Sequence, residues 1–231
     1  MISNKTITGL NGTPIIPGDK SISHRSIIIP SISNGICEVN NYLKSDDVMN
    51  TIKAFMLMGV KIYENNNKII VEGKGLNSLN KPTDKIYLGN SGTSARLLTG
   101  LLSSQSFNST LIGDKSLSSR PMKRITDPLE ELNAHIITND GKMPIIIQGG
   151  KLTNGNIEIK IPSAQIKSGI LLAALNIAGK TKIIENNITR DHTEIMLEAF
   201  EAEIKTTRQD EKKIIEIEGK KELKSKNIDV P

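Results

Sequence analysis

Three polar turns carry residue types suited to anion binding, and each turn stands directly before an apolar run. The first, PGDKSISHRS at 17–26, places Lys20, Ser21 and Arg25 ahead of consecutive isoleucines. Lysine is a compact positive charge and arginine a fork of N–H donors, and both match the oxygens of phosphates and carboxylates. A turn that opens a helix adds free backbone N–H groups and the positive end of the helix dipole. The predicted chemistry is therefore the binding of anionic ligands.

The other two turns offer comparable residues, and two arginines lie in turns that open further helices. In the second turn, Gly92 lets the backbone approach a ligand closely because it has no side chain. Each residue also has an ordinary explanation as a helix cap, a turn glycine or a solvated charge. Their equivalent positions in a repeated unit favour a shared site. The candidates are Lys20, Ser21, Arg25, Asn90, Ser91, Gly92, Thr93, Arg96, Arg120, Ser163, Gln165, Lys167 and Arg190.

The chain repeats one structural unit, over about 16–80, 81–152 and 153–222. Each copy is predicted to contain a short strand, a polar turn, an apolar helix, a strand, a second helix and a β-hairpin that closes on a glycine. The same order of elements at nearly equal spacing indicates a repeat architecture. We therefore expect 16–227 to form one substrate-binding lobe.

The two helices of each unit differ in character. The first is apolar on nearly every side in ARLLTGLL and GILLAALNIAG, which predicts a helix buried inside the protein. The second is amphipathic, and in the first copy its apolar stripe is predicted to be Val48, Ile52, Phe55 and Met56. The strands are short and alternating, which favours mixed sheets on the outside. We predict an inside-out α/β prism (α+β) of three βαβαββ repeats, with central buried helices whose N-termini meet on one face.

The composition limits which binding partners and which cellular location are expected. The chain has 231 residues and a net charge of +5, which suits an anionic partner, either nucleic acid or a phosphorylated metabolite. With Phe 3, Tyr 3 and Trp 0 it offers few platforms for base stacking, so nucleic acid is the weaker prediction. The single cysteine, Cys37, favours a reducing, cytoplasmic location. We find no segment with the length and apolarity of a membrane helix.

Motifs for metal or nucleotide cofactors are missing from the sequence. His24, His135 and His192 show no metal-ligand spacing with Cys37, so we expect no metal site and interpret Cys37 as a buried structural thiol. No Walker or dinucleotide glycine motif is present. The sequence therefore contains no motif that predicts a metal site or a bound nucleotide.

Five segments closely resemble successive signatures of the 5-enolpyruvylshikimate-3-phosphate synthase (3-phosphoshikimate 1-carboxyvinyltransferase) family: PGDKSISHR, LGNSGTSAR, GDKSLSSRPMKRI, PSAQIKSG and TRDHTEIM. They cover nearly the whole chain in the family's order and spacing. The resemblance implies transfer of the enolpyruvyl group of phosphoenolpyruvate to the 5-hydroxyl of shikimate 3-phosphate, with release of phosphate, on the route to chorismate and aromatic amino acids. It also implies no metal or organic cofactor, a monomer at full length, and room for glyphosate beside Gly92.

The same resemblance assigns a role to each candidate by motif. Lys20 would touch both substrates and act in proton transfer, as the catalytic residue. Ser21 and Arg25 would hold shikimate 3-phosphate, while Gly92 and Arg120 would bind phosphoenolpyruvate. The other substrate-binding residues would be Ser163 and Ala164 along shikimate 3-phosphate, Gln165 between both ligands, and Asn90, Thr93, Arg96 and Arg190 in support. Many relatives have serine where this chain has Ala164, so a contact there can come only from the backbone.

The resemblance further implies a second lobe, because family members are longer and have two. Residues 1–15 would pack in that second lobe, and residues 228–231 would begin the crossover to it. The family's acidic catalytic residues and further arginines for phosphoenolpyruvate belong to the other half. We therefore expect this chain alone to lack turnover and to bind shikimate 3-phosphate only weakly.

Two alternatives share the repeat fold. One is the sister enolpyruvyl transferase that acts on UDP-N-acetylglucosamine, which would need a Lys-Asn pair at the first turn and a cysteine near Arg120. This chain has Lys20-Ser21 and no such cysteine, which disfavours it. The other is a non-catalytic anion- or RNA-binding module, since the RNA 3′-phosphate cyclases use related units. A salt-dependent RNA interaction without a response to shikimate 3-phosphate would favour that reading.

Overall fold

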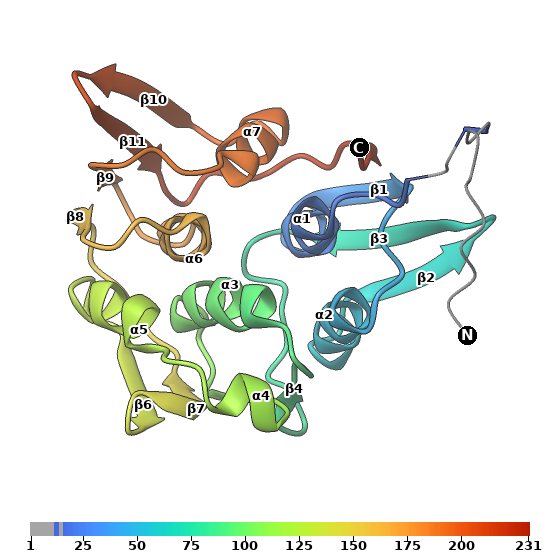
Figure 1. Ribbon diagram of the computed structural model, residues 1–231, viewed down its shortest axis with the longest axis horizontal. Coiled ribbons are helices and arrows are strands. Elements are labelled where there is room, and N and C mark those ends of the chain that lie inside the picture. The colour runs from blue at the N-terminus through green and yellow to red at the C-terminus, as the bar shows by residue number, and fades with distance from the viewer. Residues whose placement is uncertain (1–11, 14–15) are drawn as a thin grey trace, which may run out of the picture.

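Sheets form the outside of the molecule and helices fill its centre (Figure 1). The computed structural model describes Gly12, Thr13 and residues 16–231. The helices are α1 (Lys20–Ser31), α2 (Asp46–Leu57), α3 (Gly92–Ser103), α4 (Lys115–Ser118), α5 (Lys123–Glu130), α6 (Ala164–Ala174) and α7 (His192–Ala199). The strands are β1 (Asn34–Asn40), β2 (Lys61–Asn65), β3 (Lys68–Lys74), β4 (Ile86–Tyr87), β5 (Ser109–Ile112), β6 (His135–Asn139), β7 (Lys142–Gln148), β8 (Asn156–Ile159), β9 (Lys180–Glu185), β10 (Ile204–Gln209), β11 (Lys212–Glu218) and β12 (Ile228–Asp229).

The described residues form three four-stranded sheets with one shared plan. Their strand orders are β12-β1-β3-β2, β4-β5-β7-β6 and β8-β9-β11-β10. In each sheet the first pair is parallel and the other pairs are antiparallel. The predicted inside-out prism of three repeats with mixed outer sheets is therefore confirmed.

The first sheet departs from the predicted order of elements. We expected each repeat to open with its own strand, but Ile16 lies outside any strand. The equivalent position is taken by β12, which pairs in parallel with β1 through Val39 and Ile228. The Asp19 backbone N–H also donates to the Pro231 carbonyl at 2.8 Å. Strand pairing between segments so far apart in sequence leaves no local pattern for a sequence-based prediction to detect.

The central helices α1, α3 and α6 are buried along most of their length, as predicted. Between α3 and α6 the backbones nearly touch at two glycines. A Cβ on Gly100 would lie 1.9 Å from the Gly169 carbonyl oxygen, and a Cβ on Gly169 would lie 2.7 Å from the Arg96 carbonyl oxygen. Glycine at both positions is therefore what lets these two helices pack so closely.

The amphipathic helix α2 follows its prediction with one exception. Ser45 caps it, and Val48, Ile52 and Phe55 are buried. Met56, however, is 51% exposed, so its place in the apolar stripe was predicted wrongly. The buried arc is rotated toward the smaller side chains of α2, which a hydrophobic pattern weights too lightly.

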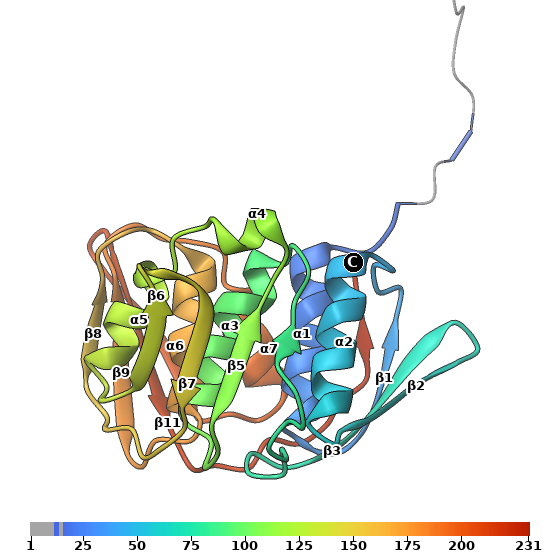
Figure 2. The same ribbon diagram turned by 90° about the horizontal axis from the view of Figure 1, so that it is seen from below.

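The central helices run side by side through the molecule (Figure 2). The chain enters α1 at the end of the molecule where α4 and the C-terminus lie. Among the described residues no helix is long and apolar enough to cross a membrane.

Candidate functional site

A polar cavity of about 490 Å³ lies where α1, α3 and α6 begin. It is lined by the first residues of α1 and α3 and by Gln165 in the first turn of α6. Eight predicted site residues line it: Lys20, Ser21, Asn90, Gly92, Thr93, Arg120, Gln165 and Arg190. The predicted meeting of the three turns is thus observed in the geometry. We refer to this cavity as the anion pocket.

Side-chain caps hold the start of each central helix at the anion pocket. The Ile22 N–H donates to the Asp19 carboxylate at 2.8 Å, and the Ser94 N–H donates to the Ser91 hydroxyl at 3.1 Å. The third cap is the Ser163 hydroxyl, which accepts from the Ile166 N–H. Each helix start brings the positive end of a helix dipole, which stabilises bound anions.

Ser163 and Ala164 do not line the anion pocket, although sequence reasoning placed them in the site. Ser163 is the N-cap of α6 and Ala164 is the first residue of that helix. They directly precede Gln165 in the sequence, which explains why a motif match groups them with the site.

Arg25 lies behind the lining, with only 3% of its surface exposed. Its guanidinium donates to the Thr193 and Ser168 hydroxyls at 2.6 and 2.7 Å, and to the Ser21 carbonyl at 2.7 Å. All three acceptors are neutral, and burial is the main reason that the pKa of Arg25 is lowered to about 10. A buried cation without a carboxylate in contact is stabilised when an anion binds nearby.

Arg96 also lies behind the lining and orients a residue that does line the pocket. Its Nη1 donates to the Gln165 Oε1 at 2.9 Å and to the Gly92 carbonyl at 3.1 Å. The Gln165 Nε2 in turn donates to the Thr93 hydroxyl at 2.9 Å. Arg96 thereby selects the orientation of the Gln165 amide, which leaves a second Nε2 hydrogen for a ligand.

Gly92 lies between two guanidinium groups. A Cβ there would lie 2.8 Å from the Arg96 Nη1 and 2.9 Å from the Arg120 Nη1. Arg120 also donates to the Asn90 side-chain carbonyl. The absence of a side chain at Gly92 therefore lets both cations approach the start of α3.

Two acidic residues of the anion pocket were missed by the sequence analysis. Asp19 and Asp47 both line it, and the Asp47 carboxylate lies 3.1 Å from the Lys20 Nζ. The side chain of Lys20 is 52% exposed, so this ion pair is open to solvent and contributes little to stability. Asp47 stands in the first turn of α2, where an acidic residue is equally explained by the helix dipole.

Lys167 was predicted to suit an anion site, and this prediction was wrong. Its ammonium is fully buried and lies 2.8 Å from the Glu185 carboxylate and 2.7 Å from the Glu194 carboxylate. Lys213 also contacts Glu194, at 3.1 Å. Lys167 points into this buried ion cluster because its position in α6 faces α7 and β9 rather than the helix start.

Cys37 is fully buried, as predicted. Burial, helped by the neighbouring Glu38, raises the pKa of its thiol to about 12. The described residues contain no group of three His, Cys, Asp or Glu side chains that could hold a metal ion.

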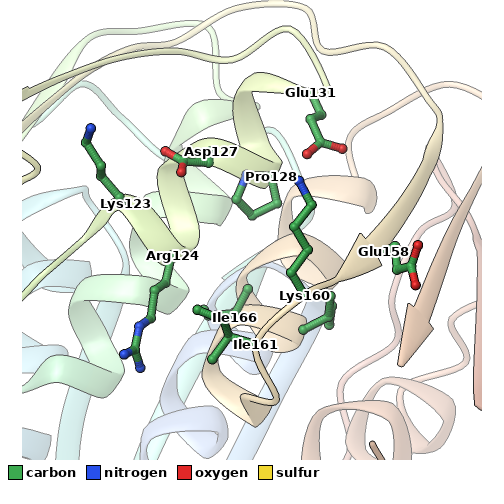
Figure 3. A pocket seen from close by; sticks show the side chains of 10 residues that line it. Lys123, Arg124, Asp127, Pro128, Glu131, Glu158, Lys160, Ile161 and Ile166 are labelled. Atoms are coloured by element: carbon green, nitrogen blue, oxygen red, sulfur yellow. The ribbon is translucent and has the colours of Figure 1, made fainter. Parts of the chain in front are cut away.

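A second hollow, of about 250 Å³, lies between α5 and the end of β8 (Figure 3). Pro128, Ile161 and Ile166 form its apolar part, and charged side chains of both signs surround it. None of the predicted site residues lines this hollow.

The fold and the anion pocket together define a class: repeat α/β lobes with a polar pocket at the starts of three central helices. A family model described as EPSP synthase (3-phosphoshikimate 1-carboxyvinyltransferase) matches residues 4–231. The chain therefore belongs to the EPSP synthase family, as its sequence signatures indicated.

Individual relatives agree with this assignment. The 3-phosphoshikimate 1-carboxyvinyltransferase of Vesicomyosocius okutanii is 48% identical over 217 residues, 94% of this chain and 49% of the relative. That of Shouchella clausii is 42% identical over 230 residues, 99% of this chain and 53% of the relative. A solved structure of EPSP synthase from Acinetobacter baumannii has a TM-score of 0.88 at 43% identity, covering 95% of this chain and 49% of that one. The chain spans about half the length of the relatives that it matches.

Proposed function

We propose that this chain provides the shikimate 3-phosphate half of a 3-phosphoshikimate 1-carboxyvinyltransferase active site. The reaction transfers the enolpyruvyl group of phosphoenolpyruvate to the 5-hydroxyl of shikimate 3-phosphate and releases phosphate. The observation that carries the proposal is the anion pocket, in which residues of the family's separate signatures line one cavity at three helix starts. Two phosphates and a carboxylate repel one another, and this pocket supplies the cations and helix dipoles that offset the repulsion.

The proposed roles follow the positions of the side chains. Ser21 and Gln165 contact shikimate 3-phosphate from the lining, and Arg25 stabilises its charge from behind. Gly92 and Arg120 bind phosphoenolpyruvate. Asn90, Thr93 and Arg190 complete the lining, Ser163 and Ala164 contribute through the start of α6, and Arg96 acts by orienting the Gln165 amide.

Lys20 is the proposed catalytic residue of this chain. Addition requires a proton at the methylene carbon of phosphoenolpyruvate and the loss of one from the attacking hydroxyl, after which the tetrahedral intermediate eliminates phosphate. The ammonium of Lys20 is exposed in the pocket and paired only with Asp47 among the described residues, so it is free to approach either substrate. It can donate a proton or stabilise developing negative charge.

The domain organisation also remains a proposal. We propose that residues 16–227 form the substrate-binding lobe, whose first sheet is completed by β12, and that 228–231 also lead toward a second lobe that supplies the remaining catalytic groups. The proposed packing of 1–15 in that second lobe falls mostly on residues outside those that the structure describes. We further propose a cytoplasmic enzyme that is monomeric at full length and acts on small molecules rather than nucleic acid.

Binding and turnover measurements on the 231-residue chain test the proposal together. Calorimetry should detect shikimate 3-phosphate binding that weakens about tenfold in an Arg25→Met variant, because the variant removes the buried positive charge that offsets the charge of the ligand. Phosphate release from phosphoenolpyruvate and shikimate 3-phosphate should stay at background. Lack of binding, or RNA binding in its place, would contradict the assigned substrate, and turnover by this chain alone would contradict the need for a second lobe.

A matched control uses Arg208, an exposed arginine of β10 that does not line the pocket. An Arg208→Met variant loses the same charge as Arg25→Met. Its affinity for shikimate 3-phosphate should equal that of the unmodified chain.

A further inference from the structure

A buried histidine and three hydroxyl groups form a cluster one helical turn behind the anion pocket. His24 of α1 is fully buried, and its Nδ1 lies 2.8 Å from the Thr51 hydroxyl of α2. Its Nε2 lies 3.4 Å from the Ser91 hydroxyl, which caps α3. The Ser94 hydroxyl joins the two sides, at 2.6 Å from that of Thr51 and 2.7 Å from that of Ser91. The cluster therefore connects three helices that begin at or beside the pocket.

The hydrogen bonds of Thr51 favour a proton on Nδ1 of His24. The Thr51 hydroxyl donates at 3.1 Å to the Asp47 backbone carbonyl, which can only accept. Thr51 Oγ1, at 2.8 Å from Nδ1, is then an acceptor for His24. The Ser94 hydroxyl, at 3.2 Å from Nδ1, donates to Ser91 or Thr51. The Nε2 lone pair is left to accept from the Ser91 hydroxyl. A neutral imidazole protonated on Nδ1 satisfies every donor in the cluster.

Both ends of the cluster lead to residues that line the anion pocket. Ser91 precedes Gly92 and Thr93, so a shift of this cap moves the start of α3. Thr51 holds the backbone carbonyl of Asp47, whose carboxylate pairs with the Lys20 ammonium at 3.1 Å. His24 therefore helps to position two separate walls of the anion pocket.

Electrostatics agree with a neutral imidazole. Burial, together with the smaller effects of the Lys20 and Arg25 charges, lowers the pKa of His24 to about 4. Asp47 and Asp19 act in the opposite direction without reversing the shift. The groups that face His24 from α3 are neutral hydroxyls.

We propose that His24 is a positioning residue, which as a neutral imidazole protonated on Nδ1 holds the starts of α3 and α2 in the arrangement that binds anions. It does not touch the ligand and acts through Ser91 and Thr51. The inference rests on the proposed function only for the identity of the ligand. Its geometric part stands for any phosphate-bearing molecule in this pocket.

Two measurements on the 231-residue chain test the role of His24. Long-range ¹H–¹⁵N NMR at neutral pH should show a protonated Nδ1 and an unprotonated Nε2. Calorimetric titration should show that His24→Leu weakens the binding of inorganic phosphate and of shikimate 3-phosphate by about tenfold, as expected for the loss of a buried hydrogen-bond network. His24→Asn, whose amide can donate in place of Nδ1, should stay within about threefold of the unmodified chain.

Controls separate positioning from a purely structural role. Ile29→Ala, in the far half of the same helix, should lower stability without changing either affinity, since Ile29 is buried away from the cluster. Thr51→Val should reproduce the effect of His24→Leu, and the double variant should be no weaker than either single one. If His24→Leu does not fold, the comparison of Thr51→Val with His24→Asn decides the matter.

The possible outcomes distinguish the two proposals. Phosphate binding without shikimate 3-phosphate binding would overturn the proposed substrate and leave the role of His24 standing. A proton on Nε2, or a folded His24→Leu chain with unchanged affinities, would overturn the role of His24. Equal losses in His24→Asn and His24→Leu would also overturn it, and a chain that binds neither anion would overturn both proposals.

Discussion

The cations of the anion pocket differ in how their charge is stabilised. The Lys20 ammonium is half exposed and shares its charge with Asp47, whereas the Arg25 guanidinium is buried among neutral oxygens. Arg96 lies between these extremes, and burial is the main cause of its lowered pKa, with Arg120 and Arg124 adding to it. Cations held close together without matching anions destabilise one another. Under the proposed function, an anionic ligand would offset that cost and so couple binding to local stability.

Gly92→Ala should weaken phosphate binding by about tenfold, since loss of one charge-assisted hydrogen bond costs at least ~1.5 kcal/mol. The added Cβ meets the ends of Arg96 and Arg120, which must move away from the start of α3. Because both are flexible ends, the free energy of unfolding should change by less than about 1 kcal/mol. Calorimetry and urea denaturation on the same variant measure the two quantities. Unchanged phosphate affinity would show that the two guanidinium groups do not act at this position.

The burial of His24 predicts a specific pH dependence of stability. Its pKa falls from 6.5 in the unfolded chain to about 4 in the folded protein. Below pH 6.5 His24 therefore binds a proton in the unfolded state but not in the folded state. The free energy of unfolding decreases as the pH falls toward 4. The loss should reach at most about 3 kcal/mol. Urea denaturation across this pH range should show that His24→Asn loses less free energy of unfolding than the unmodified chain. The same pH dependence in both chains would contradict the shift in the pKa of His24.

At the scale of elements, the close contact of α3 and α6 determines the spacing of two helix starts at the pocket. It depends on Gly100 and Gly169, which have no side chains to separate the backbones. The third central helix is attached in another way, through the hydrogen bonds of Arg25 to Ser168 of α6 and Thr193 of α7. The approximate threefold symmetry of the repeats is therefore maintained by close backbone packing on one side and by a buried cation on the other.

Gly100→Ala should destabilise the chain by about 3 kcal/mol, because its Cβ would overlap backbone that cannot move freely. The overlap is with the Gly169 carbonyl oxygen, 1.9 Å away. The control is Gly150→Ala, since a Cβ at Gly150 meets nothing within 4 Å. Thermal or urea denaturation of both variants gives the comparison. Equal free energies of unfolding for Gly100→Ala and Gly150→Ala would show that α3 and α6 leave room for a side chain at Gly100.

At the scale of the molecule, the first sheet joins segments from opposite ends of the described chain. Strand β12 lies against β1, and Val230 is 2% exposed. The Pro231 carbonyl accepts from the Asp19 N–H at the start of α1. The residues that complete the first sheet therefore also support one of the helix starts of the anion pocket.

Val230→Ala should lower the free energy of unfolding by about 1.5 kcal/mol, the value of two buried methyl groups. A matched control is Ile195→Ala, at a position that is 58% exposed, which should have little effect. Denaturation curves on both variants would measure the difference. An unchanged free energy of unfolding in Val230→Ala would indicate that the segment around β12 contributes little to the stability of the lobe.

Much of the architecture could be predicted because it follows from local patterns. A helix apolar on all sides must be buried, and a repeated order of elements must place equivalent turns at equivalent positions. Those two facts predicted the central helices, the outer sheets and the eight candidates that line the anion pocket. The family signatures could be recognised in the sequence for the same reason, since each is a continuous segment.

The tertiary structure alone decided which charges line the anion pocket and which lie behind it. Arg25 and Thr193, Lys167 and Glu194, and β12 and β1 are pairs whose members lie far apart in sequence. A sequence pattern reports the character of a residue but not which distant partner shares its burial. For that reason Lys167 was mistaken for a site residue, Asp47 was missed, and His24 was passed over until its hydroxyl partners from two other helices were seen around it.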